Sequence, residues 1–213
     1  MSQLEERAQA CVHCGHTFSI QVAKSLNAVR SPVARSAAMD GTLHHFGCPQ
    51  CDTVHRVETT FGYMDVDRKH WVAVFPPTHL ADWSTLEQTA HTSFWTVTDR
   101  APMMWNFQAT ELTVRCVFGL DDLREKLRIW DAGLDDVLVE LWKLELGGRD
   151  RRLRFVEATG DDAIFETGTD GSRIAAPLVR HHLLTKLRGP LRQQHPRLFD
   201  GPFVDCRRLA TPG

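Results

Sequence analysis

The sequence lacks the features that mark secreted and membrane-spanning proteins. Its longest apolar runs, such as Trp71–Phe75, are far shorter than the roughly 18 apolar residues that a membrane span requires. The first residues, Met1–Arg7, have neither the charged start nor the apolar stretch of a secretory signal. We therefore expect a cytoplasmic protein with no membrane span.

Signatures of familiar enzymes are also missing. The chain contains no His-Glu-x-x-His metalloprotease motif, no Gly-x-Ser-x-Gly nucleophile elbow, no phosphate-binding loop and no dinucleotide fingerprint. Low-complexity tracts are absent, and the hydrophobic fraction of 42% is close to that of ordinary globular proteins. These absences make a catalytic role less expected, although they leave an unfamiliar enzyme open.

A strong overall positive charge, which is typical of nucleic-acid-binding proteins, is lacking as well. The formal net charge is −2, but the residues from Ser172 onward hold eight Arg or Lys and two Asp, which gives 8 − 2 = +6. This basic C-terminal part supplies the candidates for a nucleic-acid or anion site, namely Arg180, Lys186, Arg188 and Arg192.

Cysteine is scarce, with six residues in 213, which is too few for a disulfide scaffold. Four of the six form two Cys-x-x-Cys pairs, Cys11 with Cys14 and Cys48 with Cys51, and each pair precedes a strand-like segment. Two residues between ligands let both sulfurs of a pair face one ion, and two such pairs supply the tetrahedron that zinc prefers. The spacing predicts one structural Zn²⁺ ion.

Two other interpretations of these cysteines remain. They could be redox-active or simply buried thiols, and a site of four sulfurs would also suit iron, as in rubredoxin-like proteins. If a metal is bound, four protein ligands leave no open coordination position, so the site should be structural and not catalytic. Loss of the metal would then unfold the N-terminal part of the chain.

The patterns along the chain predict an α+β protein, with N-terminal zinc-ribbon-like β-hairpins joined to a mixed α+β body. A short helix with Pro32 at its first position and Gly41 after its end should lie between the hairpins. We expect a module over residues 1–77 and a body over 78–213, or one continuous domain. The segments that carry these expectations are strands at Thr17–Val22, Thr53–Val57, Lys69–Phe75 and Leu112–Phe118, weak helix at 79–97, helices at Gly119–Trp130 and after Asp135, a hairpin of 152–157 with 163–167, and a basic helix over Ala176–Leu187 that Gly189-Pro190 breaks.

Several stretches resemble the CpXC family, prokaryotic proteins named for paired Cys-Pro-x-Cys motifs. The likeness rests on the second pair, Cys48-Pro49-Gln50-Cys51, and on Ser25–Val29, Met64–Lys69, Leu123–Ile129 and Gly133–Asp136. This sequence departs from the family pattern at Val12, where a proline is usual, and at Asp52, where a glycine often follows. The resemblance implies a zinc-ribbon-like fold and names no reaction.

Other polar residues have competing interpretations. The histidines near the cysteines could ligate the metal or form a second metal site. We expect them instead to be solvated residues or hydrogen-bond donors to the thiolates. These histidines are His13, His16, His44, His45 and His55. Five acidic residues could form a cluster for acid-base or magnesium chemistry, but helix capping is the simpler explanation for them. These residues are Asp121, Asp122, Asp135, Asp136 and Glu140. We expect Cys116 and Cys206 to be buried thiols, and Trp130 and Trp142 to be core residues. The adjacent pair His181-His182 should not share one ligand sphere on a helix.

Three functions are compatible with these patterns. The leading hypothesis is a zinc-stabilised, non-enzymatic module that binds another protein. The alternative is a zinc-ribbon protein that binds nucleic acid through the basic C-terminal part. The third is an enzyme that uses the histidines and the acidic set.

Overall fold

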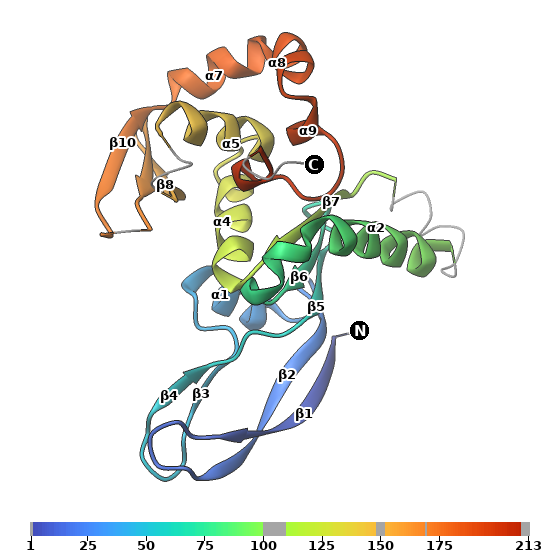
Figure 1. Cartoon of the computed structure of the whole chain (residues 1–213), viewed down its shortest axis with the longest axis vertical. Helices are drawn as coiled ribbons and strands as arrows, with labels where there is room; N and C mark the ends of the chain where they lie inside the picture. Colours follow the sequence, from blue (N-terminus) through green and yellow to red (C-terminus); the bar gives the residue numbers. More distant parts are fainter. Residues whose placement is uncertain (1, 100–109, 148–151, 169, 210–213) are drawn as a thin grey trace. The chain divides into compact units, whose positions relative to one another are not determined.

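The computed structural model describes residues 2–99, 110–147, 152–168 and 170–209. The chain divides into two compact units, Met1–Arg124 and Glu125–Gly213 (Figure 1). Strands and helices occur in both units in mixed order, so the chain has the α+β architecture that the sequence predicts. No helix in the described ranges is long and apolar enough to cross a bilayer.

The first unit is built on a five-stranded sheet with the order β1-β2-β5-β6-β7, while β3 and β4 form a separate two-stranded ribbon. The β2–β5 and β6–β7 pairs are parallel and the other pairs are antiparallel. Its elements in chain order are β1 (Gln3–Ala10), β2 (Thr17–Asn27), α1 (Pro32–Asp40), β3 (His45–Gly47), β4 (Val54–Arg56), β5 (Phe61–Asp65), β6 (His70–Phe75), the 3₁₀ helix η1 (Pro77–Asp82), α2 (Trp83–Asp99), β7 (Thr113–Phe118) and the start of α4 (Leu120–Asp131).

Sequence chemistry explains the local structure of this unit. Pro32 occupies the start of α1, and Gly41 ends it in the left-handed conformation with φ +77°, where its N–H donates to the Ala37 carbonyl. Side chains such as Val22, Tyr63 and Val72 are fully buried in the sheet. The predicted helix between the hairpins is therefore confirmed, as is the helical character of residues 79–97.

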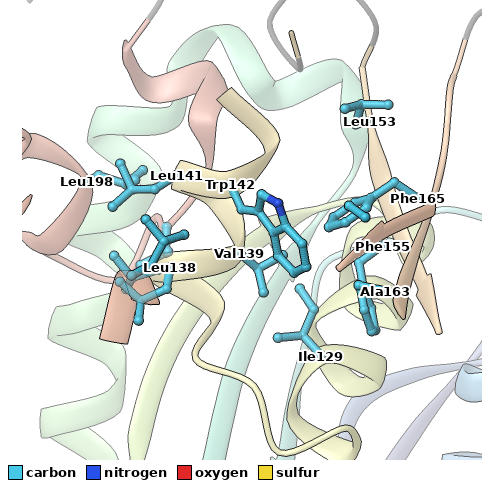
Figure 2. Close-up of a cluster of buried hydrophobic side chains, with 14 residues drawn as sticks. Ile129, Leu138, Val139, Leu141, Trp142, Leu153, Phe155, Ala163, Phe165 and Leu198 are labelled. Carbon is cyan, nitrogen blue, oxygen red and sulfur yellow. The ribbon is translucent and has the colours of Figure 1, made fainter. Parts of the chain in front are cut away.

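The second unit packs helices against a three-stranded antiparallel sheet with the order β10-β9-β8. The Trp142 ring of α5 lies edge-on against Phe165, with ring centroids 5.1 Å apart, and Leu138 and Leu141 complete the buried side of that helix (Figure 2). Besides the rest of α4, its elements are α5 (Asp136–Glu145), β8 (Arg154–Thr159), β9 (Asp162–Glu166), β10 (Arg173–Pro177), α7 (Val179–Lys186), α8 (Arg188–Gln194), α9 (Pro196–Phe199) and the 3₁₀ helix η2 (Cys206–Leu209).

The predicted basic helix starts too early, and it does not end for the reason that the sequence suggested. Ala176 and Pro177 belong to strand β10, and α7 begins only at Val179. The helix stops at Leu187, and a new helix, α8, starts at Arg188 and includes Gly189 and Pro190. Proline is tolerated in the first turn of a helix, because the N–H that it lacks has no partner within the helix there. The Gly-Pro pair therefore lies inside a helix start and does not mark a helix end.

Candidate metal centre

The first cysteine pair lies in the turn that joins β1 to β2. The Cys11 N–H donates to the His16 carbonyl at 2.8 Å, and the Gly15 N–H donates to the Cys11 carbonyl at 2.9 Å. Gly15 has φ +74°, a left-handed conformation that glycine adopts without steric cost. These bonds close a tight knuckle that turns both sulfurs toward the same side.

The second pair repeats this geometry between β3 and β4. The Cys48 N–H donates to the Thr53 carbonyl and the Asp52 N–H donates to the Cys48 carbonyl, both at 2.9 Å. Asp52 stands in the position of Gly15 and has φ +57°. Aspartate is one of the few residues that tolerate this region, so the departure from the glycine of the family pattern preserves the knuckle.

The two knuckles bring the four sulfurs together. The sulfurs of Cys11, Cys14, Cys48 and Cys51 all lie within 4.8 Å of one another, and Cys11–Cys51 and Cys14–Cys48 are each separated by 3.6 Å. Disulfide bonding requires about 2.05 Å, so these are free thiols. Four sulfurs at about 2.3 Å from a central zinc would lie about 3.8 Å apart. The donor set therefore fits one tetrahedral metal ion.

Two side chains that follow the second knuckle make hydrogen bonds with the sulfurs. His55 Nε2 lies 3.3 Å from the Cys11 sulfur, and the Cys51 thiol donates to the Thr53 hydroxyl at 3.2 Å. Once Cys51 is ionised, the same hydroxyl is a donor to its thiolate. Such donors orient thiolate ligands and stabilise their negative charge. The expectation for His55 agrees with this contact. Thr53 was not anticipated, although its position two residues after a ligand and just before strand β4 is a usable signal.

The thiols influence one another's ionisation. Hydrogen bonds from the Thr53 side chain and backbone lower the pKa of Cys51 to about 6. The backbone of His16 also favours the Cys14 thiolate, but desolvation and the neighbouring sulfurs outweigh it and raise the pKa of Cys14 to about 12. Four thiolates this close repel one another, and a bound divalent cation is what would stabilise all four together.

The other histidines near the knuckles are not part of a ligand cluster. Across the described ranges, only two groups of three or more metal-ligating side chains lie within 4.8 Å of one another, and neither contains a histidine. His13, His16 and His45 are exposed. His44 is buried and accepts a hydrogen bond from the Ala23 N–H at 3.0 Å, so it joins the β3–β4 hairpin to β2.

The second of these groups, Glu140 with Asp205 and Cys206, belongs to a buried ion network in the second unit. Lys126 and Lys143 lie 3.1 Å and 3.0 Å from Glu140, and the Cys206 N–H donates to the same carboxylate at 3.0 Å. Burial raises the pKa of the Cys206 thiol well above its usual range. Both carboxylate oxygens are thus occupied and the thiol stays protonated, which favours a structural role over metal binding.

The acidic set divides between capping and pairing. Asp135 caps α5 as expected, accepting from the Val137 and Leu138 N–H groups at 3.0 Å and 3.3 Å. Asp121 pairs with Arg56 and Arg124. Capping does not explain Glu140, which lies in the middle of α5, and it does not describe the whole role of Asp136, which lies 3.4 Å from Lys126.

The four basic candidates lie on α7 and α8, and three of them are close to carboxylates. Arg180 binds Glu145 through two nitrogens at 2.8 Å and 2.5 Å, and Arg188 pairs with Asp135. Arg192 lies 3.9 Å from Asp200, and Lys186 is exposed. Exposed ion pairs contribute at most about 1 kcal/mol, so an incoming phosphate could compete for these side chains.

Comparison with known proteins supports the sequence resemblance. The sequence profile of the family described as "CpXC protein" matches residues 10–143, more than half of the chain and all four clustered cysteines. No curated protein and no solved structure shows significant similarity to the chain.

Proposed function

The chain belongs to the CpXC family, and from that premise we propose that its four clustered cysteines bind one structural Zn²⁺ ion in a non-enzymatic, protein-binding module. The observation that carries this proposal is the convergence of four sulfurs from two hairpins that are otherwise separate. The ligands come from positions 34 to 40 residues apart, so the ion would connect distant parts of the chain.

The β3–β4 hairpin explains why an ion is needed. Each of its strands has three residues, and in the described sheet order the two strands pair only with each other. An isolated two-stranded hairpin is at best marginally stable in water. Metal ligation on Cys48 and Cys51 would tie this hairpin to the longer β1–β2 ribbon and supply folding free energy directly.

Zinc is favoured over iron because the site needs no redox chemistry to perform this structural role. When bound, the ion supplies four metal–thiolate bonds and leaves no position for a substrate. A thiolate site of this kind suits a reducing compartment, which is consistent with a cytoplasmic protein.

Elemental analysis of the purified full-length chain tests the metal directly. We expect one equivalent of zinc, and its removal by a strong chelator should unfold the β1–β4 region as followed by hydrogen exchange. Replacing Cys48 by serine should abolish zinc retention, whereas replacing the exposed neighbour His13 by alanine should leave it intact. A metal-free protein whose hairpins resist exchange in chelator would refute the proposal, and one equivalent of iron would correct the metal.

The protein-binding part of the proposal is supported by the exposed edge of the five-stranded sheet. Strand β1 stands at the end of the sheet order, and all of its residues are exposed or half-buried. Such an edge offers backbone N–H and C=O groups to a strand from a partner. Recovery of the native protein as a solitary species in every fraction would count against this part.

Nucleic-acid binding through Arg180, Lys186, Arg188 and Arg192 is the competing proposal. Affinity that depends on phosphate contacts falls steeply as salt concentration rises. Titration of labelled DNA and RNA at low salt therefore separates the two proposals, and the absence of binding there would eliminate this one.

A further inference from the structure

Helix α7 carries apolar side chains on two opposite sides. His181 and Leu184 face the interior of the second unit, with 5% and 1% of their surface exposed. Val179 and Leu183 of α7, and Leu187 at its C-cap, follow one another at intervals of four residues and remain 60%, 44% and 48% exposed. Residues four apart lie on one helix face. These three side chains form an exposed row, which we call the α7 ridge.

The α7 ridge requires an explanation because its members are aligned. Single exposed apolar side chains are common on protein surfaces, whereas contiguous ones mark surfaces that bind something. The ridge spans eight residue steps, which is about 12 Å along a helix axis. Rows of side chains four residues apart are also the rows that interlock when two helices pack against each other.

Positive groups lie on both sides of the α7 ridge. At 3.6 residues per turn, Lys186 falls on one flank and Arg180 falls on the other. No aspartate or glutamate occurs between Gly171 and Phe199. The helices α7 and α8 carry four Arg or Lys, and Arg180, Arg188 and Arg192 lie close to the carboxylates of Glu145, Asp135 and Asp200. Among the described residues no carboxylate pairs with the exposed Lys186, so these two helices keep 4 − 3 = +1 charge beside the ridge.

The positive charge beside the α7 ridge indicates which kind of molecule could bind there. A second copy of the chain packing ridge to ridge would oppose two basic surfaces, which is unfavourable. A membrane-surface helix usually inserts aromatic and leucine side chains over a greater length, while this ridge offers three aliphatic side chains on an eight-residue helix. A partner helix needs only a short apolar row and acidic residues beside it.

We propose that the α7 ridge docks an amphipathic helix of another protein whose apolar row is flanked by aspartate or glutamate. This inference rests on the protein-binding part of the proposed function and specifies the partner's chemistry. The ridge lies in the second unit and the cysteines lie in the first. Each proposal can therefore fail while the other stands.

Fluorescence anisotropy with the full-length, zinc-loaded chain tests the inference. The probe is a synthetic helix-stabilised peptide with a leucine row flanked by glutamates, and its counterpart has lysines in place of the glutamates. We expect the glutamate peptide to bind, and Leu183→Glu to weaken it at least about tenfold. Lys186→Glu should reduce the preference for the glutamate peptide over the lysine peptide.

The matched control is Val33→Glu, which changes a side chain that is 83% exposed on α1 and should leave peptide binding unchanged. Equal binding of the two peptides, or full affinity in Leu183→Glu, would overturn the inference. The inference would also be overturned if the protein were a dimer that Leu183→Glu dissociates. Binding to vesicles of anionic lipid that is lost in Leu183→Glu would overturn it as well. If the peptide fails while chelation still unfolds the hairpins, the metal proposal survives and the α7 ridge proposal does not.

Discussion

Replacing Gly15 by alanine should weaken metal binding through the backbone alone. Gly15 has φ +74°, and a Cβ atom added there would meet no atom within 4 Å. The substitution therefore introduces no clash and isolates the cost of holding an alanine in the left-handed region, which is about 1–2 kcal/mol. Because knuckle folding and metal binding are coupled, this cost should appear as about 5-fold to 30-fold weaker zinc affinity.

Asp52 supplies the complementary experiment. It occupies the equivalent position of the second knuckle with φ +57°, and Asp52→Gly removes the steric cost there. The gain should stay below about 1 kcal/mol, since aspartate already tolerates this conformation and glycine loses more entropy on folding. We expect zinc affinity to rise by less than about fivefold.

Competition with a chromophoric chelator of known zinc affinity measures both changes. Gly15→Asn should cost less than Gly15→Ala, because asparagine adopts positive φ more readily. Gly47→Ala is the matched control, since Gly47 lies just before the second knuckle, lacks a positive φ and has open space at its Cβ. Unchanged affinity in Gly15→Ala, or weaker affinity in Asp52→Gly, would refute the argument that backbone conformation limits the knuckles.

Three further predictions concern the rest of the chain. Glu140→Gln should destabilise the second unit by about 3–5 kcal/mol, because it leaves Lys126 and Lys143 buried beside too little negative charge. Hydrogen exchange of the α5 amides measures this loss, and Glu157→Gln, which changes an exposed side chain, is the control. Burial lowers the pKa of His181, which accepts the Asp135 N–H at 3.1 Å. The folded form therefore binds this proton less readily than the unfolded form, and stability present above about pH 6.5 should be lost as the pH falls, by up to about 1.4 kcal/mol per pH unit. In His181→Gln, urea unfolding at pH 7 and pH 5 should show a smaller difference. Gly41→Ala should lower the melting temperature of the first unit, because Gly41 has φ +77° and an added Cβ would displace the Arg124 guanidinium. An unchanged melting temperature would contradict this prediction and show that Arg124 moves aside without cost.

The cysteine cluster was predictable because the information for each knuckle is local. Two Cys-x-x-Cys pairs and the strands after them specify two knuckles, and the structure brings their four sulfurs together. The helix from Pro32 to Asp40 was equally local, with proline at its start and Gly41 at its end. In each case a few neighbouring residues determine the conformation.

The sheet could not be derived in the same way. Strand β1 is polar and almost wholly exposed, so it lacks the apolar alternation that identifies a strand, and it exists because it pairs with β2. Strand β7 joins the same sheet beside β6 although a helix lies between them in the sequence. Pairing between distant segments leaves little trace in a local pattern.

The buried ion network shows a different limit. Glu140 was grouped with the acidic residues at helix starts and explained by capping, and periodicity gives no reason to place a charged residue of an amphipathic helix in the interior. In the structure Glu140, Lys126 and Lys143 are each at most 3% exposed. Burial opposes the charge of Lys143, but Glu125 and Glu140 outweigh it and raise its pKa. Only the tertiary pairing of opposite charges reveals that these residues belong to the interior.

The family match extends to Lys143, beyond the end of the first unit at Arg124, and so includes only part of the second unit. The match stops at Lys143, inside α5, whereas the side chains that cover α5 come later, from Phe155, Phe165 and Leu198 (Figure 2). The Cys206 N–H that binds Glu140 also lies beyond the matched region. Residues 10–143 therefore contain the whole cysteine cluster but only part of the packing that buries α5. In this chain, the segment after Lys143 completes the core around a helix that the matched segment covers only in part.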